Sequence, residues 1–584
     1  MLKNIIDAMP AKLGYLVVFL FALFLFVPGL DRVHLFDWDE INFAESAREM
    51  IVTGDYFRVR INYDPFWEKP PLFFWFQALS MKIFGVNDFA ARLPNAITGI
   101  ITMLVFFDIA RKKYSKTFGI FWCLTYAGTL LPHFYFKSGI IDPLFNLFIF
   151  LGIFHIAQFS SYKNQGDTKA RVRYAFFAGL FTGLAVLTKG PVALLVMLLC
   201  CLVYMIANKT IKPFSLRNVS VFAITCALVS FIWFGLETLK NGPWFIVTFI
   251  EYQIRLFSTQ DAGHGGPFIY HWVVLLVGCF PASIFVAKGI AKSYDENPTQ
   301  KMIRFWLVTS LFVVLVLFSI VETKIIHYSS YCYLPISFFA TDYLVKWMDR
   351  KKTFPNWQKL LLAIVGVIWS LAVLIIPFVG MNAQNIPNMV KIDDVFAVAN
   401  LQAEVEWNGW ESLIGILLLS SLVFFFVFMK KRPILSTVVL FAGTILFIQT
   451  VLYVIVPKIE RYSQGANIDF LKSLENEDCY IFMVDFKSYA HYYYPKIKLD
   501  QNPLHNEALM KNADSLLIKC PEIENPQQRY DCVRDWFLEG KIDKPVYFIT
   551  KNDRGHWLKE KPQLRLLNEK NGFLFYKREL YNSN

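Results

Sequence analysis

Charged residues are scarce in this 584-residue chain. Lys, Arg, Asp and Glu make up only 18% of it, whereas an ordinary soluble domain carries about 25%. Hydrophobic residues make up 55%, and apolar runs close to 20 residues recur along the chain. Such runs are long enough to cross a hydrocarbon core of about 30 Å. The composition therefore excludes a soluble globular protein and predicts an α-helical polytopic membrane protein.

Other absences narrow the function. The nine cysteines show no spacing typical of a metal site, although the spacing of Cys520 and Cys532 in the polar tail would allow a disulfide. Internal repeats and charges in the middle of spans, both typical of transporters, do not stand out. A lipid transporter or flippase is therefore a distant alternative.

The net charge of +12 indicates topology and gives no reason to expect a nucleic-acid partner. The basic residues form short clusters between apolar runs, such as 111–113 and 430–432, at alternate loops. This is the bias of cytoplasmic loops. We expect a cytoplasmic N-terminus and about thirteen spans, so that the chain after Val456 lies in the periplasm. The expected spans are 13–30, 92–110, 117–135, 143–160, 174–188, 191–207, 219–236, 268–287, 305–321, 330–346, 360–380, 411–429 and 434–456.

Two regions outside the spans have their own character. The first outer loop, about 31–91, is rich in aromatic residues, which suits helices at the level of the lipid headgroups. Residues 457–584 alternate strand-like and helix-like runs, a pattern typical of a small α/β domain. We therefore expect a transmembrane domain at 1–456 and a periplasmic α/β domain at 457–584. The strand-like runs are 479–486, 514–519, 544–550 and 573–579.

Acidic residues are concentrated directly after the first apolar run, in FDWDEINFAESAREM (36–50). Acids at the start of a helix favour its positive end, which accounts for some of them. A second cluster follows in DPFWEKPPLFFW, where Glu68 and Lys69 precede Pro70 and Pro71. The double proline stiffens the backbone. A charged pair held rigidly at the membrane surface indicates a functional site.

In this region the sequence resembles the aminoarabinose lipid A transferases, the ArnT family. The matching runs are DEINFAESAREMIVTGDY, FWEKPPLFFW, IIDPLFNLF, LTKGPVALL, IRLFSTQDAGHGGPFIY and ETKIIHYSSYCYLP. These membrane glycosyltransferases have the GT-C fold and are related to protein O-mannosyltransferases. The resemblance implies a multi-pass protein of the bacterial inner membrane with an outer α/β tail.

The resemblance also implies a donor, a polyprenyl-phosphate-linked sugar. Cations must bind its phosphate and stabilise that phosphate as it leaves. The positions that match phosphate contacts of the family are Lys69, Lys189 and Tyr328. Lys189 could also be a lysine that snorkels from a helix end to the interface, although the following Gly190-Pro191 opens a helix whose N-terminus favours anions.

Three carboxylates are catalytic candidates by the same resemblance. Asp39 matches the family's principal acidic residue, Asp142 matches a second, and Glu40 adjoins the first. Asp142 could equally be the N-cap of a helix that begins at Pro143. Glu68 and His264 match a pair that can hold a metal, with zinc as the expected ion, although two protein ligands make an incomplete site.

We therefore expect an inverting glycosyltransferase, because a single displacement at the anomeric carbon needs no enzyme nucleophile. The expected acceptor is lipid A or a related glycolipid. A protein O-glycosyltransferase with the same donor is the alternative, and oligosaccharyltransferases fit less well because their Trp-Trp-Asp motif is absent. An acceptor phosphate would need Asp39 only for orientation or charge stabilisation, whereas a hydroxyl would need it as general base. The sequence leaves these roles open.

Overall fold

The computed structural model describes residues 2–66, 68–161, 168–210, 214–260, 263–291 and 296–580. It confirms a mostly helical polytopic membrane protein with a mixed sheet near the C-terminus. The chain forms two compact units. The first unit comprises Met1–Leu30, Phe66–Leu374 and Leu413–Val451, and the second comprises Asp31–Pro65, Ile375–Ser412 and Leu452–Asn584.

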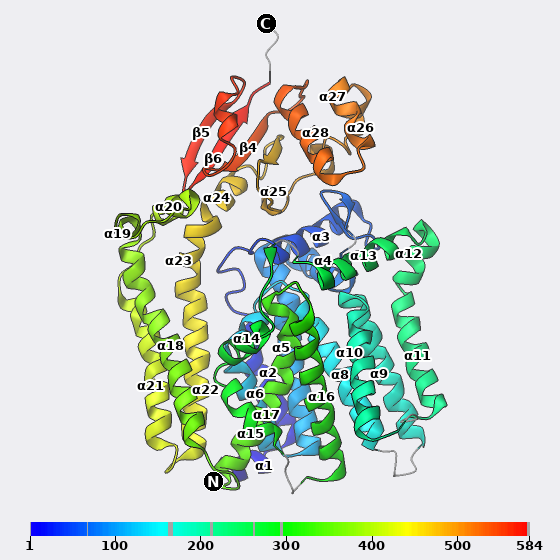
Figure 1. The fold of residues 1–584 in the computed structure, drawn as a ribbon, viewed down its shortest axis with the longest axis vertical. Coiled ribbons are helices and arrows are strands. Elements are labelled where there is room, and N and C mark those ends of the chain that lie inside the picture. The colour runs from blue at the N-terminus through cyan, green and yellow to red at the C-terminus, as the bar shows by residue number, and fades with distance from the viewer. Residues whose placement is uncertain are drawn as a thin grey trace. The chain divides into compact units, whose positions relative to one another are not determined.

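The first unit is helical (Figure 1). Its helices, with α18 extending into the second unit, are α1 (Leu2–Ala8), α2 (Ala11–Phe26), α4 (Leu72–Phe84), α5 (Asp88–Lys113), α6 (Lys116–Ala127), α7 (Leu130–Tyr135), α8 (Asp142–Ser161), α9 (Thr168–Lys189), α10 (Val192–Ala207), α11 (Leu216–Phe231), α12 (Phe234–Asn241), α13 (Trp244–Ser258), α14 (Tyr270–Gly278), α15 (Ser283–Ile290), α16 (Pro298–Ile320), the 3-10 helix η3 (Ile326–Cys332), α17 (Tyr333–Met348), α18 (Asn356–Met381), α21 (Leu413–Phe428) and α22 (Pro433–Thr450). Helices α8 and α9 pack as a pair, and α9 also packs against α11.

Fewer helices have the length and composition of a span than the sequence predicts. Within the described ranges seven qualify: Asp88–Lys113, Asp142–Ser160, Thr168–Lys189, Pro298–Ile320, Asn356–Met381, Trp410–Phe428 and Pro433–Ser473. Two bent helix pairs raise the number to nine. The expected span 268–287 is such a pair, α14 and α15, bent by 107° around Pro281, which has no N–H to continue a helix. The expected span 117–135 is divided into α6 and α7.

The second unit joins the Asp31–Pro65 segment to the C-terminal region. The helices and strands of this unit are α3 (Asp39–Thr53), β1 (Arg60–Ile61), β2 (Asp64–Pro65), α19 (Ile386–Met389), α20 (Val395–Leu401), α23 (Val456–Glu460), α24 (Ala466–Ser473), β3 (Tyr480–Met483), α25 (Ala490–Tyr493), α26 (Glu507–Lys511), α27 (Ser515–Ile518), α28 (Pro526–Glu539), β4 (Val546–Lys551), β5 (Arg565–Lys570) and β6 (Phe573–Arg578). The sheet order is β3-β4-β6-β5, with β3 and β4 parallel and the other pairs antiparallel.

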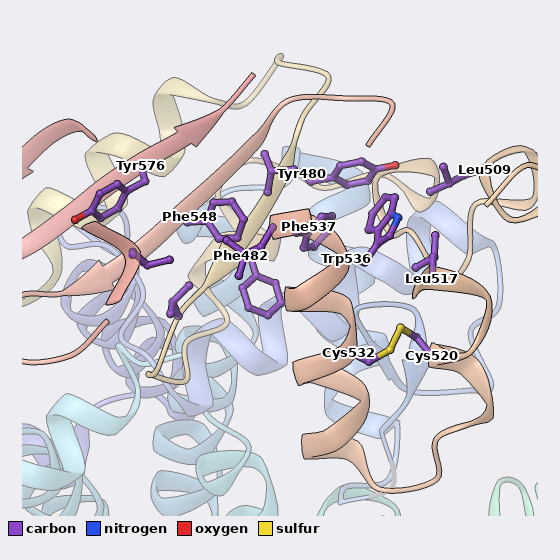
Figure 2. Close-up of a cluster of buried hydrophobic side chains, with 14 of the residues drawn as sticks. Tyr480, Phe482, Leu509, Leu517, Cys520, Cys532, Trp536, Phe537, Phe548 and Tyr576 are labelled. Carbon is purple, nitrogen blue, oxygen red and sulfur yellow. A yellow bond between two sulfur atoms is a disulfide. The ribbon is translucent and has the colours of Figure 1, made fainter. Parts of the chain in front are cut away.

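Aromatic side chains fill the core between this sheet and α28. Tyr480 and Phe482 from β3, Phe548 from β4, and Trp536 and Phe537 from α28 are all buried there (Figure 2). Burying an aromatic side chain removes roughly 150–250 Å² from water. The expected α/β tail therefore has a core of its own.

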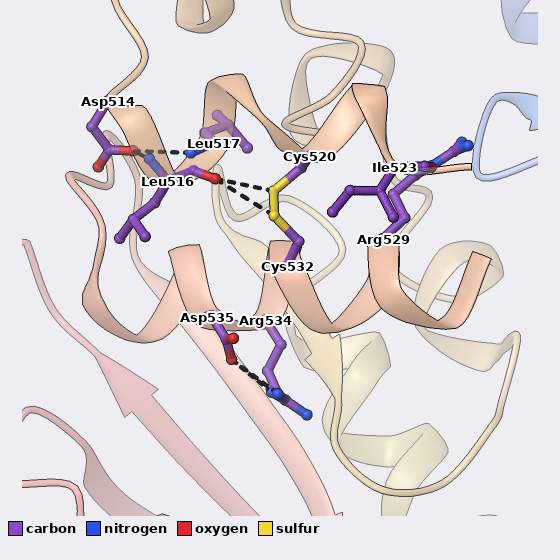
Figure 3. Close-up of a disulfide and its surroundings, with 9 residues drawn as sticks. All are labelled: Asp514, Leu516, Leu517, Cys520, Ile523, Arg529, Cys532, Arg534 and Asp535. Carbon is purple, nitrogen blue, oxygen red and sulfur yellow. Dashed lines mark hydrogen bonds and ion pairs between the residues drawn. A yellow bond between two sulfur atoms is a disulfide. The ribbon is translucent and has the colours of Figure 1, made fainter. Parts of the chain in front are cut away.

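A disulfide between Cys520 and Cys532 fastens α28 to the preceding turn (Figure 3), as the spacing allowed. The run 514–519, directly before Cys520, contains the helix α27. The strand that the sequence predicted there is therefore wrong. The Asp514 carboxylate accepts the N–H groups of Leu516 and Leu517, both at 3.1 Å. Such an N-cap favours a helix over a strand.

Candidate functional site

Asp142 and Lys189 meet at one end of the α8–α9 pair. Asp142 is the first residue of α8 and Lys189 is the last residue of α9. The Lys189 ammonium donates to Asp142 Oδ1 at 2.5 Å. The Lys189 side chain is 13% exposed and the Asp142 side chain is 4% exposed. Each charge lies at the helix end that favours it, the acid at an N-terminus and the base at a C-terminus.

Tyr328 completes this group. The Lys189 ammonium lies 5.3 Å from the centroid of the Tyr328 ring and 5.7 Å from that of Phe145, within the range of a cation–π contact. The turn that carries Tyr328, η3, is fixed on both sides. Asn146 donates to Ser330 Oγ at 2.9 Å, and His271 Nδ1 lies 3.1 Å from Ser329 Oγ. The structure thus brings together three predicted residues that are far apart in the sequence.

The link after Lys189 depends on a glycine. Gly190 has a φ of +97°, a conformation that glycine adopts without strain. A Cβ there would also lie 2.5 Å from Phe249 Cζ of α13. This turn lets α10 begin directly after α9 and brings α13 against the end of the pair.

Lys69 belongs to a second cationic group. Its ammonium lies 5.2 Å from the centroid of the Tyr252 ring, and the Arg255 guanidinium lies 5.1 Å from the same ring. Both Tyr252 and Arg255 come from α13, which runs across the end of the helices (Figure 1). Glu68 supplies a carboxylate 4.0 Å from Lys69. The group therefore gathers two cations around one ring, an arrangement suited to an anion.

Arg255 and Tyr252 escaped prediction from the sequence. The run IRLFS that contains Arg255 lies in a strongly amphipathic helix, where a single basic residue is ordinarily a solvated one. The only available indication was its place in a stretch that resembles the ArnT family. The structure adds the contact with Tyr252 and, through it, with Lys69.

An apolar cluster lies beside both cationic groups. Leu72 of α4, Leu187 of α9, Trp233 just before α12, and Phe245 of α13 are buried against one another. Leu72 follows Lys69 by three residues, and Leu187 precedes Lys189 by two. The cations therefore border a shared apolar surface, which could accommodate a hydrocarbon chain next to a charged headgroup.

Lys324 has a structural role instead. Its ammonium donates to the carbonyl groups of Phe318, Ser319 and Val321, near the C-terminal end of α16. A lysine in this place satisfies carbonyls that have no partner within the helix.

The proposed metal pair is not a complete site. His264 is exposed, and its carbonyl accepts the N–H of Lys324 at 2.8 Å. Glu68 is paired with Lys69. The described part of the chain has no group of three or more His, Cys, Asp or Glu side chains that could hold a metal. Protein zinc sites use three or four protein ligands, so Glu68 and His264 alone do not fit one.

In the second unit, most carboxylates of the segment 36–50 are bound by the protein. Glu45 accepts two hydrogen bonds from Arg48, both at 2.7 Å, and Arg48 donates to the carbonyl of Ile497 at 2.8 Å. Glu49 accepts the N–H of Tyr63 at 2.9 Å. Burial and the neighbouring Glu45 raise the pKa of Glu49 well above its usual range. These side chains anchor α3 to the C-terminal region.

Asp37 and Glu40 also have local partners. Asp37 accepts a hydrogen bond from the Ser488 hydroxyl and one from the N–H of Tyr489 at 3.2 Å. Burial raises the pKa of Asp37 to about 6. Glu40 is buried, and its Oε2 accepts the N–H of Phe36 at 2.9 Å. This hydrogen bond ties Glu40 to the segment that leads into α3.

Asp39 is the first residue of α3 and is half-buried. It follows Trp38, a residue that is 46% exposed. Lys487 lies 4.9 Å from the centroid of that ring, and Lys551 lies 4.2 Å from the centroid of Phe396. Both lysines lower the pKa of Asp37 electrostatically. The start of α3 is therefore surrounded by cations and aromatic rings of the second unit.

The chain is similar to known proteins along most of its length. Residues 68–234 match the family model of the dolichyl-phosphate-mannose-protein mannosyltransferases. The undecaprenyl phosphate-alpha-4-amino-4-deoxy-L-arabinose arabinosyl transferase of Aeromonas hydrophila is 25% identical over 359 residues, which are 60% of this chain and 64% of that protein. The enzyme of the same name from Photorhabdus laumondii is 26% identical over 345 residues, 58% of this chain and 61% of that protein. The chain thus spans less than two thirds of the length of these relatives.

The fold agrees with this likeness. The crystal structure of ArnT from Cupriavidus metallidurans bound to undecaprenyl phosphate matches with a TM-score of 0.73 at 18% identity, over 97% of this chain and 98% of that one. Its apo structure matches with the same score. The chain is therefore ArnT-like, since it has the fold of ArnT over nearly its whole length and is similar in sequence to the arabinosyl transferases and to the protein mannosyltransferase family.

Proposed function

We propose that the chain transfers a sugar from a polyprenyl-phosphate donor to an acceptor at the outer face of a bacterial inner membrane. The observation that carries the proposal is the pair of cationic groups, Lys189 with Tyr328 and Lys69 with Arg255, beside one apolar cluster. A lipid-linked phosphate has this combination of an anion and a hydrocarbon chain. The names of the arabinosyl transferase relatives, which include undecaprenyl phosphate, support the same donor class.

In this proposal the cations act on the leaving group. As the bond between the anomeric carbon and the phosphate oxygen breaks, its electron pair stays on the phosphate, and the negative charge there grows. Lys69, Lys189 and the Tyr328 hydroxyl would stabilise that charge more in the transition state than in the ground state. Lys189 has three donors, of which one binds Asp142, so two remain for a phosphate.

The acceptor oxygen attacks the same carbon from the opposite face, which inverts its configuration and needs no enzyme nucleophile. We assign Asp39 to the acceptor and the reacting sugar. If the acceptor is a hydroxyl, Asp39 takes its proton as general base. If the acceptor is a phosphate, no proton is lost, and Asp39 orients the substrate or stabilises positive charge on the ring.

Lipid A or a related glycolipid is our preferred acceptor. Lys487 and Lys551 place positive charge near the start of α3, which favours an acidic headgroup over a neutral peptide. The match of residues 68–234 to protein mannosyltransferases supports the second candidate, a protein O-glycosyltransferase. Both candidates use the same donor class and differ only in the acceptor.

We also propose that the second unit lies in the periplasm and the N-terminus in the cytoplasm. The Cys520–Cys532 disulfide supports this orientation, because disulfides persist in oxidising compartments. A Lys559→Cys variant tests it, since Lys559 is exposed and the native Cys479 is buried. A membrane-impermeant thiol reagent should label this variant in intact cells with a permeable outer membrane. Labelling only after lysis of the inner membrane would overturn the orientation.

The proposal assigns no step to a metal. Zinc analysis of the purified protein, with His264→Ala as comparison, tests that choice. If the wild type holds one equivalent of zinc and the variant loses it, Glu68 and His264 form a metal site, and a role for the metal must be added to the mechanism.

Turnover by the purified protein tests the function itself. Radiolabelled undecaprenyl-phosphate sugars are incubated with lipid A, with dephosphorylated lipid A or with a Ser/Thr-rich peptide. We expect label in lipid A and release of undecaprenyl phosphate, both lost in Lys189→Gln. Label in the peptide would favour the protein O-glycosyltransferase. Movement of the donor across vesicles without its consumption would indicate a flippase and overturn the proposal.

A further inference from the structure

A cavity lies in the first unit, far along the helices from the Asp142–Lys189 pair. It has a volume of about 670 Å³ and lies among α2, α5, α8 and α9. The volume is typical of a ligand site, about 300–1,000 Å³. Phe154, on its wall, follows Asp142 by twelve residues of α8, or about 18 Å at 1.5 Å per residue. The cavity therefore shares no residue with the proposed donor site.

Its wall is apolar along most of its length and charged at one end. Ile101, Leu104 and Val105 line it from α5, and Leu151 and Phe154 line it from α8. The charged end is formed by Asp108, Lys112 and Lys113. The cavity is thus amphipathic in one direction, like a lipid.

The charged end carries more cations than it can neutralise. Asp108 accepts hydrogen bonds from the Tyr15 hydroxyl, from Arg111 at 2.9 Å and from Lys112 at 2.6 Å. Arg111 also donates to the Tyr15 hydroxyl at 2.8 Å. One carboxylate thus pairs with two cations, Arg111 and Lys112, and Lys113 lines the same end of the cavity. Among the described residues at this end, positive charge is in excess, and an anion would balance it.

The length of the cavity matches a single leaflet. From Ile101 to Lys113, α5 advances twelve residues, or about 18 Å, and half of a hydrocarbon core is about 15 Å. We propose that this cavity binds an anionic glycerophospholipid, with an acyl chain along α5 from Ile101 and the headgroup at Lys112 and Lys113. This site goes beyond the sugar-transfer reaction and does not depend on it.

The lysines determine which headgroup the site selects, and the apolar wall holds the acyl chain. Each Lys or Arg near an anionic lipid surface contributes about 1 kcal/mol, so two lysines favour an anionic over a zwitterionic headgroup by roughly tenfold or more. The apolar wall contributes equally to both kinds of lipid, because their acyl chains are the same.

The purified full-length protein can be titrated with phosphatidylglycerol or phosphatidylcholine of equal chain length and followed by native mass spectrometry. We expect tighter binding of phosphatidylglycerol, by roughly tenfold or more. K112Q/K113Q should lose this preference while phosphatidylcholine binding stays the same. K430Q/K431Q is the matched control, because it removes two adjacent exposed lysines elsewhere in the chain, and it should keep the preference.

A variant that fills the cavity tests its shape separately. Val105→Trp should weaken binding of both lipids without changing their ratio, and thermal unfolding verifies that each variant is folded. Equal affinity of the wild type for both lipids would overturn the proposal, as would a preference unchanged in K112Q/K113Q. Displacement of phosphatidylglycerol by undecaprenyl phosphate, with the same dependence on Lys112 and Lys113, would identify a second carrier site and overturn the assigned occupant.

Discussion

The acidic segment 36–50 and the cationic groups of the helical unit both look like active-site sequences, but they differ in what their charges contact. In the acidic segment, Asp37, Glu45 and Glu49 accept hydrogen bonds from neighbouring residues of the same unit. In the helical unit, Lys69 and Lys189 each lie near one carboxylate and also against aromatic rings. Hydrogen-bonded buried carboxylates hold a fold together, whereas cations on aromatic rings keep donors available for an anion. A high density of charged residues in the sequence is therefore not enough to identify an active site.

The largest expected effect separates two acids that are two residues apart. Asp39→Asn should reduce transfer by more than about a hundredfold, because general acid–base or charge stabilisation contributes about 10²–10⁴. Asp37→Asn should stay within a fewfold of the wild type, since Asn can accept from Tyr489 and donate to Ser488. Turnover with saturating donor and acceptor measures both. A larger loss in Asp37→Asn than in Asp39→Asn would reverse the assignment.

The next effect combines stability with activity at the Asp142–Lys189 pair. Lys189→Gln should lose transfer and also lower the unfolding temperature, because a buried charge left without its partner costs about 3–5 kcal/mol. The double variant D142N/K189Q removes both charges. It should recover most of the stability but none of the donor binding.

This double variant distinguishes the two roles of Lys189. If the lysine only joins α8 to α9, the double variant will regain both stability and activity. If it binds phosphate, stability returns alone. Donor affinity and unfolding temperature, measured on the same preparations, decide between them.

A smaller loss is expected for the second cationic group. A hydrogen bond to a charged group is worth about 1.5–3 kcal/mol, so Lys69→Ala should weaken donor binding by roughly ten- to a hundredfold. Arg255→Gln should act in the same direction because Arg255 shares Tyr252 with Lys69. Lys240→Gln is the control, because Lys240 is an exposed lysine on α12. Normal donor affinity in both Lys69→Ala and Arg255→Gln would remove this group from the donor site.

Much of the fold could be predicted because it depends on long apolar runs and alternating patterns. The membrane helices and the C-terminal sheet follow from these. The number of uninterrupted spans did not follow, because breaks at residues such as Pro281 divide apolar runs without changing their hydropathy. Strand β5, which is mostly exposed and polar, had no apolar pattern, and α27 depended on one capping side chain, Asp514.

The candidate site was predictable only in part. Resemblance to a family singled out Asp142, Lys189 and Tyr328, and the structure brings them together. The resemblance included the stretch with Arg255 but did not single it out, because one basic residue on an amphipathic helix is ordinarily solvated. Asp39 and Glu40 show a different limit of prediction from the sequence. Two adjacent acids look alike in the sequence, and only the structure shows that Glu40 is buried and accepts a hydrogen bond from the N–H of Phe36.

The last effect leaves turnover nearly unchanged and concerns the stability of the second unit and its dependence on pH. The pKa of Asp37 is raised to about 6, against an ordinary value near 3.9. The folded chain therefore holds a proton between about pH 4 and 6 that the unfolded chain has released. Stability falls as the pH rises through this window. Above pH 6 the ionised Asp37 costs up to about 3 kcal/mol, and below about pH 4 the cost disappears.

Asp37→Asn cannot ionise and should avoid this cost. The variant should unfold at a higher temperature than the wild type at pH 7.5, and the difference should shrink steadily toward pH 4.5. Asp55, whose pKa is lowered, contributes stability that is lost as the pH falls, but it is present in both proteins and cancels in the comparison. A difference that does not change with pH, or a variant less stable at pH 7.5, would show that Asp37 is held as a stabilising anion. The ionised Asp37 would then help to hold the fold together, as the other acids of the segment do, and the contrast with the cationic groups would sharpen.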